Sequence, residues 1–333
     1  MKIAVIGSGK LGQRHLDSWS KIQGVEVVGV IARNKTRLDE VANKYGIKSY
    51  TSIQELLAAT DVDVIDICTP TDTHSELVKE AANAKKHVIC EKPLALTAEE
   101  AEEAILVCKE NNVQLHIGHT LRFFPEYANA RQQILDGSIG KPGVIRMKRG
   151  VPHPPNGDSW YADEARSGGL FLDLGIHDLD WLLWTFGDVQ RVMAKRVKRS
   201  SEEKGNVEFG FITLKMTDGT ICYVELSWAE TNFHASFELA GDKGMITYNH
   251  NESNPLEVQI RPQVGNQSGV QVPRNVLEKD PYQRQLEHFV NCLLGKEEPI
   301  ITAEEAAKSI KVAQAAIRSA KEGQPVTLTE GGR

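Results

Sequence analysis

In the first third of the chain, short apolar runs alternate with stretches in which apolar positions recur at helical spacing. The apolar runs are rich in β-branched residues and too short for helices, which predicts strands. They cover residues 3–6, 25–31, 62–67, 87–90 and 114–117. The helical stretches cover residues 10–20, 35–44, 53–59, 73–84 and 98–111, and Ser52 and Thr97 stand where N-caps are expected. This alternation predicts a doubly wound parallel sheet of the Rossmann type.

The pattern changes at about residue 120, beyond which runs of strands follow one another. Strands are expected at residues 144–149, 189–198, 207–216, 220–227, 235–239, 245–248 and 256–260, with an Asp218-Gly219 turn between two of them. Helices are expected at residues 126–135, 176–186, 281–294 and 303–321, and residues 151–166 are expected to be irregular. We therefore expect a Rossmann domain at 1–120 and an α+β domain at 121–333 with a large, open, mainly antiparallel sheet. Whether the closing helices pack back on the first domain stays open.

Length and composition agree with two folded domains. The 333 residues exceed what one core usually organises, and 41% hydrophobic with 25% charged residues is ordinary for a globular protein. A net charge of −6, with acids and bases interspersed, favours neither nucleic acid nor membrane partners. The five cysteines lack paired spacing, so neither a disulfide framework nor a metal site is expected. Without a signal-peptide pattern or a membrane-length apolar run, we expect a soluble, cytoplasmic protein.

The first strand leads directly into a glycine-rich loop, Gly7-Ser8-Gly9-Lys10-Leu11-Gly12, which matches G-x-G-x-x-G. Alone, this pattern also fits a chance glycine-rich turn, but here it follows a strand and opens a helix, as dinucleotide binding requires. Gly7 permits the tight turn, Gly9 lets the backbone approach a pyrophosphate, and Gly12 allows the helix to pack against the strand. These six residues are therefore predicted to bind a dinucleotide cofactor.

The end of the second strand bears on the choice between NAD and NADP. An acid normally stands there to bind the adenine ribose of NAD, but the sequence is Ile31-Ala32-Arg33-Asn34. Arg33 can pair with a 2′-phosphate and stack on adenine, with Asn34 beside it. The alternative is that these are solvated residues at a helix start. Charge favours NADP slightly over NAD.

Two further sequences leave strands at the edge of the sheet where ligands bind. Cys68-Thr69-Pro70-Thr71-Asp72-Thr73-His74 follows one strand, and Cys90-Glu91-Lys92-Pro93-Leu94 follows the next. Lys92 precedes proline, which holds it on a stiff, extended turn, although a surface lysine is the simpler interpretation. In the second domain, Asp173 and His177 are four residues apart at a helix start, where a carboxylate can orient an imidazole base. An N-cap aspartate and a core histidine are the alternative.

Together, the glycine loop, CTPTDTH, EKPLA and SGGLFLDLGIHDLD occur in the order and spacing of one family. The chain resembles the glucose–fructose oxidoreductase / inositol dehydrogenase (Gfo/Idh/MocA) family over essentially its whole length. The resemblance implies that Lys92, Asp173 and His177 are catalytic and that Thr69, Pro70, His74, Glu91 and Lys92 contact the cofactor. It also implies that the second domain forms the substrate face and the contact of a homodimer or homotetramer. The Lys92-Pro93 bond is often cis in such relatives, and Gly168-Gly169-Leu170 lacks a third glycine that is frequent there.

The activity expected from this resemblance is hydride transfer between nicotinamide and a carbinol carbon of a sugar, inositol or related polyol. His177, oriented by Asp173, takes the hydroxyl proton, and Lys92 binds the same oxygen. Four further residues, each also compatible with a core or rim position, are candidate substrate contacts: His119, Arg122, Trp160 and Arg166. Two alternatives stay open, an NAD-dependent glycosidase or lyase and a non-catalytic dinucleotide sensor. Retention of both the lysine and the histidine disfavours the sensor.

Overall fold

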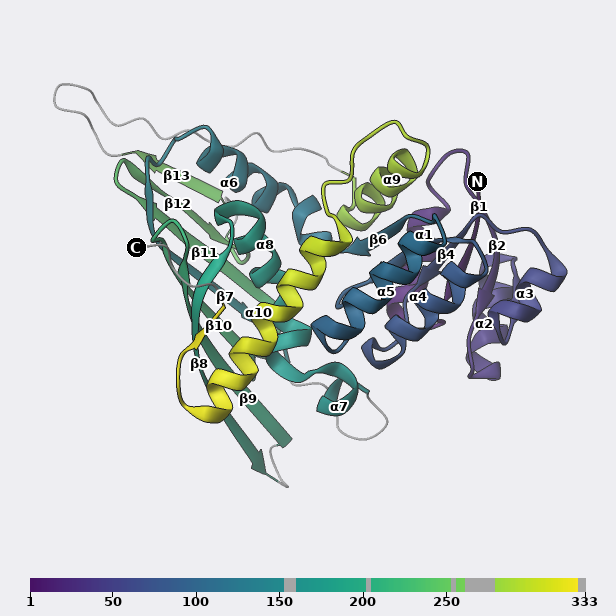
Figure 1. Cartoon of the computed structure of the whole chain (residues 1–333), viewed down its shortest axis with the longest axis horizontal. Coiled ribbons are helices and arrows are strands. Elements are labelled where there is room, and N and C mark those ends of the chain that lie inside the picture. Colours follow the sequence, from purple (N-terminus) through teal and green to yellow (C-terminus); the bar gives the residue numbers. More distant parts are fainter. Residues whose placement is uncertain (153–159, 202–204, 253–255, 261–278, 329–333) are drawn as a thin grey trace. The chain divides into compact units, whose positions relative to one another are not determined.

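The computed structural model describes residues 1–152, 160–201, 205–252, 256–260 and 279–328. The chain forms two compact units (Figure 1). The first consists of Met1–Phe123 and Glu278–Lys308, and the second of Phe124–Leu277 and Ser309–Arg333. The division falls within one long helix, α10 (Ala303–Glu322): its start, up to Lys308, belongs to the first unit and the rest to the second.

The first unit is built on a parallel sheet of six strands in the order β3-β2-β1-β4-β5-β6. These are β1 (Lys2–Ile6), β2 (Glu26–Ile31), β3 (Lys48–Tyr50), β4 (Val64–Ile67), β5 (His87–Glu91) and β6 (Leu115–Gly118). The order reverses between β1 and β4, and open parallel sheets bind ligands beyond the carboxyl ends of the strands at such a point. The glycine loop and the loop after Ile67 both begin there.

Helices cover both faces of this sheet. The helices are α1 (Lys10–Trp19), α2 (Lys35–Tyr45), α3 (Ile53–Ala59), α4 (His74–Asn83), α5 (Ala98–Glu110) and α9 (Pro281–Leu293), with short 3₁₀ turns η1 (Thr71–Thr73) and η2 (Thr120–Phe123). One apolar core joins the sheet to α1, α2 and α9 through side chains such as Val5, Trp19 and Phe289. Figure 1 shows α4 and α5 side by side, and the two helices are in close contact. The segment Glu278–Lys308 thus belongs to the first unit although it follows the second sheet in the chain.

The second unit is built on a mixed sheet in the order β13-β12-β11-β7-β10-β9-β8-β14. The strands are β7 (Pro142–Gly150), β8 (Val189–Ser201), β9 (Gly205–Met216), β10 (Ile221–Trp228), β11 (His234–Gly241), β12 (Gly244–Asn249), β13 (Leu256–Ile260) and β14 (Val326–Thr327). Only the β7–β10 pair among these is parallel. Asp218 stabilises the β9–β10 turn by accepting a hydrogen bond from the Thr220 amide at 2.9 Å.

Helical segments pack on one face of this second sheet. They are α6 (Pro125–Leu135), η3 (Trp160–Ala162), α7 (Glu164–Ser167), η4 (Leu170–Leu174, a π-helical turn) and α8 (Ile176–Phe186). Aromatic rings of Tyr127, Trp181 and Phe237 join α6, α8 and β11. A buried ion pair adds to this core: Arg149 of β7 donates from Nε and Nη2 to the Asp178 carboxylate at 2.7 and 2.9 Å.

The fold class expected from the sequence is confirmed, and so are the caps. Ser52 accepts a hydrogen bond from the Glu55 amide, and Thr97 forms a capping box with Glu100. The short edge strand β3 was not expected, because three residues carry too little pattern to stand out. Of the segment expected to be irregular at 151–166, residues 153–159 lie outside the described part, whereas the remainder includes the short helix α7.

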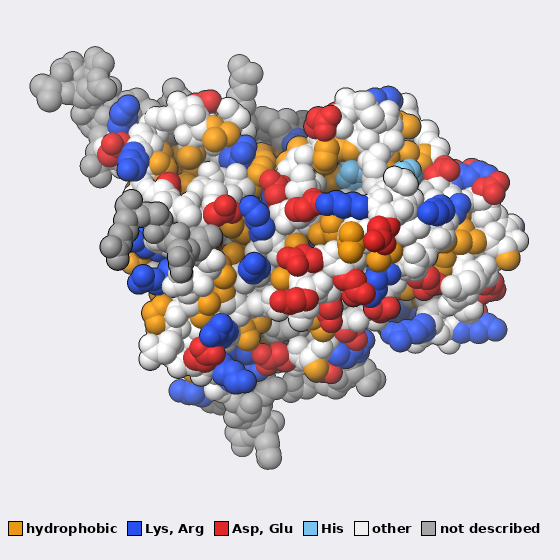
Figure 2. Space-filling model, viewed as in Figure 1, with side chains coloured by type: hydrophobic (Ala, Val, Ile, Leu, Met, Phe, Trp, Pro, Cys, Tyr) orange, Lys and Arg blue, Asp and Glu red, His pale blue; other side chains and the backbone are white. Residues whose placement is uncertain are grey.

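The surface agrees with the modest net charge. On the face shown in Figure 2, acidic and basic side chains are interspersed and neither sign dominates. Several acidic and basic side chains of the described residues form ion pairs, such as Lys79 with Glu103 and Lys109 with Glu304. Among the residues that the structure describes, no helix has both the length and the apolar character needed to cross a membrane.

Candidate active site

The glycine loop has the geometry that phosphate binding requires. Gly7 has a φ of +123°, and a Cβ there would lie 2.3 Å from the carbonyl oxygen of Cys68. A Cβ on Gly12 would lie 1.9 Å from the carbonyl oxygen of Gly7, so α1 can start this close to β1 only without a side chain. At Gly9 a Cβ would meet no atom within 4 Å. The backbone of Gly9 therefore borders open space at the N-terminus of α1, where a helix favours an anion.

These features fit the pyrophosphate of a dinucleotide. Two of the three glycines are needed by the fold itself, while Gly9 leaves space that the fold does not use. Ser8 is buried, whereas Lys10 is exposed at the start of α1. Space beside a glycine at a helix N-terminus is what close approach of a phosphate needs.

At the end of β2, the residues from Ile31 to Asn34 include one base, Arg33, and no acid. Arg33 is exposed, and so is Asn34. Asn34 is the N-cap of α2, since its side chain accepts a hydrogen bond from the Arg37 amide at 3.1 Å. The local structure thus gives Asn34 a capping role and leaves Arg33 at the surface beside the strand end.

His74 joins the two other strand-end loops. Its ring nitrogens lie 2.7 Å from the Pro93 carbonyl oxygen and 2.8 Å from the Thr69 carbonyl oxygen. Burial lowers the pKa of His74, which favours the neutral ring despite the two carbonyl contacts. The Lys92-Pro93 peptide bond is cis. The structure therefore brings Thr69, Pro70, His74, Glu91 and Lys92 together at one edge of the first sheet, next to the loop that starts at Gly7.

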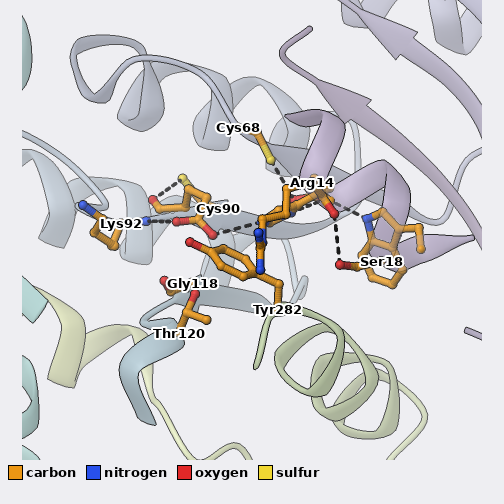
Figure 3. Close-up of polar contacts among 12 residues, drawn as sticks. Arg14, Ser18, Cys68, Cys90, Lys92, Gly118, Thr120 and Tyr282 are labelled. Carbon is orange, nitrogen blue, oxygen red and sulfur yellow. Dashed lines mark hydrogen bonds and ion pairs between the residues drawn. The ribbon is translucent and has the colours of Figure 1, made fainter. Parts of the chain in front are cut away.

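Beneath these loops lies a buried polar cluster that the sequence analysis missed (Figure 3). His15 of α1 contacts Asp66 of β4 at 2.9 Å through Nδ1 and Glu91 of β5 at 3.0 Å through Nε2. Trp19 also donates to Asp66, at 2.7 Å. One signal was available: Asp66 interrupts the apolar strand Val64–Ile67, and a carboxylate in a buried strand requires a partner.

Part of this cluster also has the composition of a metal site. Ligand atoms of His15, Asp66 and Cys68 lie within 4.8 Å of one another. However, the Cys68 thiol donates to Asp66 at 3.7 Å, and burial raises the pKa of that thiol, so the thiolate that a metal prefers is disfavoured. These groups are already hydrogen-bonded to one another, so the cluster is better described as a network of protonated groups than as a metal site.

The predicted Asp/His pair lies in the second unit. Asp173 is buried within the π-helical turn η4, and His177 is partly exposed in the first turn of α8. Gly169 precedes this turn with a φ of +72°, a backbone conformation that glycine adopts readily. Asp173 is not the N-cap of α8, because that position is Gly175. Single π turns inside helices are frequent at functional sites.

The four candidate substrate contacts are distributed between the two units. In the first unit, His119 and Arg122 are buried, and Arg122 donates to the Ile300 carbonyl at 2.7 Å and to Glu305 at 3.0 Å. Arg122 thus anchors the segment that leads into α10. In the second unit, Trp160 stacks on Tyr161 at 3.9 Å between ring centroids, and Arg166 is partly exposed in α7.

Comparisons with known proteins find relatives that match nearly the whole chain. A myo-inositol 2-dehydrogenase of Thermotoga maritima is 31% identical over 338 residues, covering 99% of each chain. A 4-carboxy-2-hydroxymuconate-6-semialdehyde dehydrogenase of Sphingobium is 41% identical over 240 residues, covering 68% of this chain and 72% of that protein. The crystal structure of a probable dehydrogenase from Thermotoga maritima is similar with a TM-score of 0.82 and 29% identity, covering 98% of each chain.

Two family models match in succession. Residues 1–119 match the oxidoreductase family with an NAD-binding Rossmann fold, and residues 131–328 match the C-terminal α/β domain of the same family. The resemblance that the motifs indicated is thereby confirmed. The chain belongs to the Gfo/Idh/MocA family of oxidoreductases.

Proposed function

We propose that this protein is an NAD(P)-dependent dehydrogenase that transfers a hydride between nicotinamide and a CH–OH carbon of a sugar, inositol or related polyol. The observation that carries the proposal is the position of Lys92. It follows β5 at the same sheet edge as the glycine loop, where open parallel sheets bind their ligands, so Lys92 would be among the residues near a dinucleotide held by the loop. The myo-inositol 2-dehydrogenase relative, which matches over 99% of each chain, supports this substrate class.

In the proposed mechanism, bound NAD(P) supplies the chemistry of accepting or returning a hydride. Lys92 donates a hydrogen bond to the reacting oxygen and stabilises the negative charge that develops on it. His177 takes the hydroxyl proton during oxidation and returns it during reduction. Asp173 fixes the tautomer and orientation of His177.

For the cofactor we propose a preference for NADP over NAD. The strand-end segment 31–34 offers the exposed Arg33 and no carboxylate, and Asn34 is used as a helix cap. A guanidinium forms strong, paired hydrogen bonds with a phosphate such as the 2′-phosphate of NADP.

For the second domain we propose the substrate face and the contact of a homodimer or homotetramer. Trp160 and Arg166 precede the turn that carries Asp173, and we assign them to the substrate side. The sheet face opposite the helices exposes apolar side chains on neighbouring strands, namely Val197 (β8), Phe209 and Phe211 (β9), and Ile221 (β10). Exposed apolar groups of this kind are typical of an interface between protein chains.

The test is an absorbance assay of a panel of inositols, sugars and polyols with NAD and with NADP. We expect reduction of the cofactor by at least one polyol, and a strong loss of turnover in Lys92→Ala. Lys86→Ala is the matched control and is expected to leave turnover unchanged, because Lys86 directly precedes β5, at the end of the strand opposite to Lys92. Equal rates in the wild type and Lys92→Ala would refute the assigned role of the lysine.

A further inference from the structure

The His15 ring in the first unit lies between two carboxylates, and all three residues are buried. His15 is 0% exposed, Asp66 0% and Glu91 3%. Both ring nitrogens have carboxylate oxygens as partners, at 2.9 and 3.0 Å. Ionised carboxylates accept hydrogen bonds and cannot donate them. Each ring nitrogen can therefore form its contact fully only if it carries a proton.

The other groups around the ring are compatible with a His15 that carries a proton on both ring nitrogens. Burial alone lowers the pKa of His15, but Asp66 raises it, and the net pKa is well above the ordinary value of 6.5. Cys68 remains a neutral thiol that donates to Asp66. Tyr282 of α9 meets the ring edge-on at 5.9 Å between centroids, and burial raises its pKa to about 12. The guanidinium of Arg14 lies 4.6 Å from the centroid of the Tyr282 ring and pairs with Asp280.

The carboxylate of Glu91 has two hydrogen-bond partners and packs against a glycine. His15 holds Oε1, and the backbone amide of Lys92 donates to Oε2 at 3.3 Å. Oε1 also fills the space beside Gly118 of β6, where a Cβ would lie only 2.6 Å away, so the carboxylate fits there only because this position is glycine. Figure 3 shows Lys92 extending away from this cluster, next to Cys90. The next residue along, Pro93, is held by His74.

We infer that His15 is a positioning residue: through Glu91 it fixes the Glu91-Lys92-Pro93 loop to the helix that receives the pyrophosphate. His15 lies on α1, whose N-terminus follows Gly9, so one rigid element carries the phosphate site and the support of the lysine. The inference rests on the proposed function for Lys92. On this inference, His15 itself contacts neither substrate nor cofactor. It sets the geometry of Lys92, which contacts the substrate in the proposed mechanism.

The charge state is tested without any turnover, by ¹⁵N NMR of the histidine rings in the full chain. We expect one histidine, identified by its absence from His15→Gln, to have both ring nitrogens protonated at pH 8. A His15 ring with one unprotonated nitrogen at neutral pH would overturn the inference. NADH fluorescence titration of the same samples is expected to show affinity weakened by no more than a few-fold in His15→Gln, because the glycine loop is untouched.

The positioning role is tested by kinetics with the best polyol of the panel. Displacement of a catalytic group by about 1 Å costs on the order of 100-fold in rate, so we expect His15→Phe to lower kcat by about 10- to 100-fold with little change in KM. His15→Gln, which retains one donor, is expected to recover part of the loss. Ser18→Ala is the matched control, because Ser18 is a buried polar residue of α1 that donates only to its own helix at the Arg14 carbonyl.

A merely structural role gives a different result. It would lower the unfolding temperature of His15→Phe and leave kcat per folded molecule unchanged, which would overturn the inference. Absence of wild-type turnover with every polyol would instead count against the proposed function, while the NMR experiment would still decide the charge state of His15.

Discussion

Replacement of Gly9 by valine separates cofactor binding from folding at the glycine loop. A Cβ at Gly9 meets nothing within 4 Å, and the residue has an extended backbone with φ of −72° and ψ of −176°. Valine adopts this conformation readily, so we expect the free energy of unfolding to change by no more than about 0.5 kcal/mol. The same side chain would occupy the place of the pyrophosphate. The variant should fold and fail to bind.

The expected loss of affinity follows from the hydrogen bonds that the phosphates would forfeit. A hydrogen bond to a charged group contributes about 1.5–3 kcal/mol, so the loss of two weakens binding by roughly 10²- to 10⁴-fold. NADH fluorescence titration measures this loss, and urea denaturation measures stability on the same protein. A folded Gly9→Val variant with wild-type affinity would refute the assignment of the loop.

Gly12→Ala is the contrasting variant. Alanine inside a helix normally stabilises by about 0.5–1 kcal/mol relative to glycine. Here its Cβ would lie 1.9 Å from the Gly7 carbonyl oxygen, which forces α1 away from β1. Overpacking of this kind costs about 1–3 kcal/mol, so we expect net destabilisation. A variant more stable than the wild type would show that the close approach of helix and strand is not needed.

Three further predictions concern the cofactor, the catalytic pair and acid stability. Arg33→Ala should weaken NADP binding by about 1.5–3 kcal/mol and NAD binding much less, as measured by parallel titrations; tighter wild-type binding of NAD would contradict the preference. His177→Ala should lower kcat by about two to four orders of magnitude with dinucleotide affinity nearly intact, and normal turnover would remove its assigned role. Arg196 holds the pKa of Glu164 at about 2, below the ordinary 4.5, so the contribution of this carboxylate to stability is present above pH 4.5 and is lost as pH falls toward 2. Urea denaturation between these pH values should therefore show a weaker acid dependence in Glu164→Gln, by no more than about 1 kcal/mol for a partly exposed pair.

The sequence predicted local structure better than the partners of buried charges. Strong β-branched runs such as Val64–Ile67 and the caps Ser52 and Thr97 depend on neighbours within a few residues, so their pattern is visible along the chain. The partner of Asp66 is instead His15, 51 positions away, and the contact exists only because α1 packs on the sheet to which β4 belongs. For the same reason, the sequence could not show that Arg122 binds Glu305 rather than solvent.

The acidic run Asp173-Leu174-Gly175-Ile176-His177-Asp178 offers two carboxylates, and the structure gives them different surroundings. Spacing favoured Asp173 as the partner of His177, whereas Asp178 is 1% exposed and held by two hydrogen bonds from Arg149. Removing one member of a buried ion pair costs about 3–5 kcal/mol, because the other charge stays buried without compensation. Asp178→Asn should therefore destabilise the protein strongly.

Asp173→Asn is the matched variant, because Asp173 lies four residues before His177. We expect it to lower kcat, by less than His177→Ala does. Urea denaturation and turnover per folded molecule, measured on both variants, separate the two effects. If Asp178→Asn kept wild-type stability and lost turnover while Asp173→Asn kept turnover, the orienting carboxylate would be Asp178. The spacing of Asp173 and His177 would then have indicated the wrong partner.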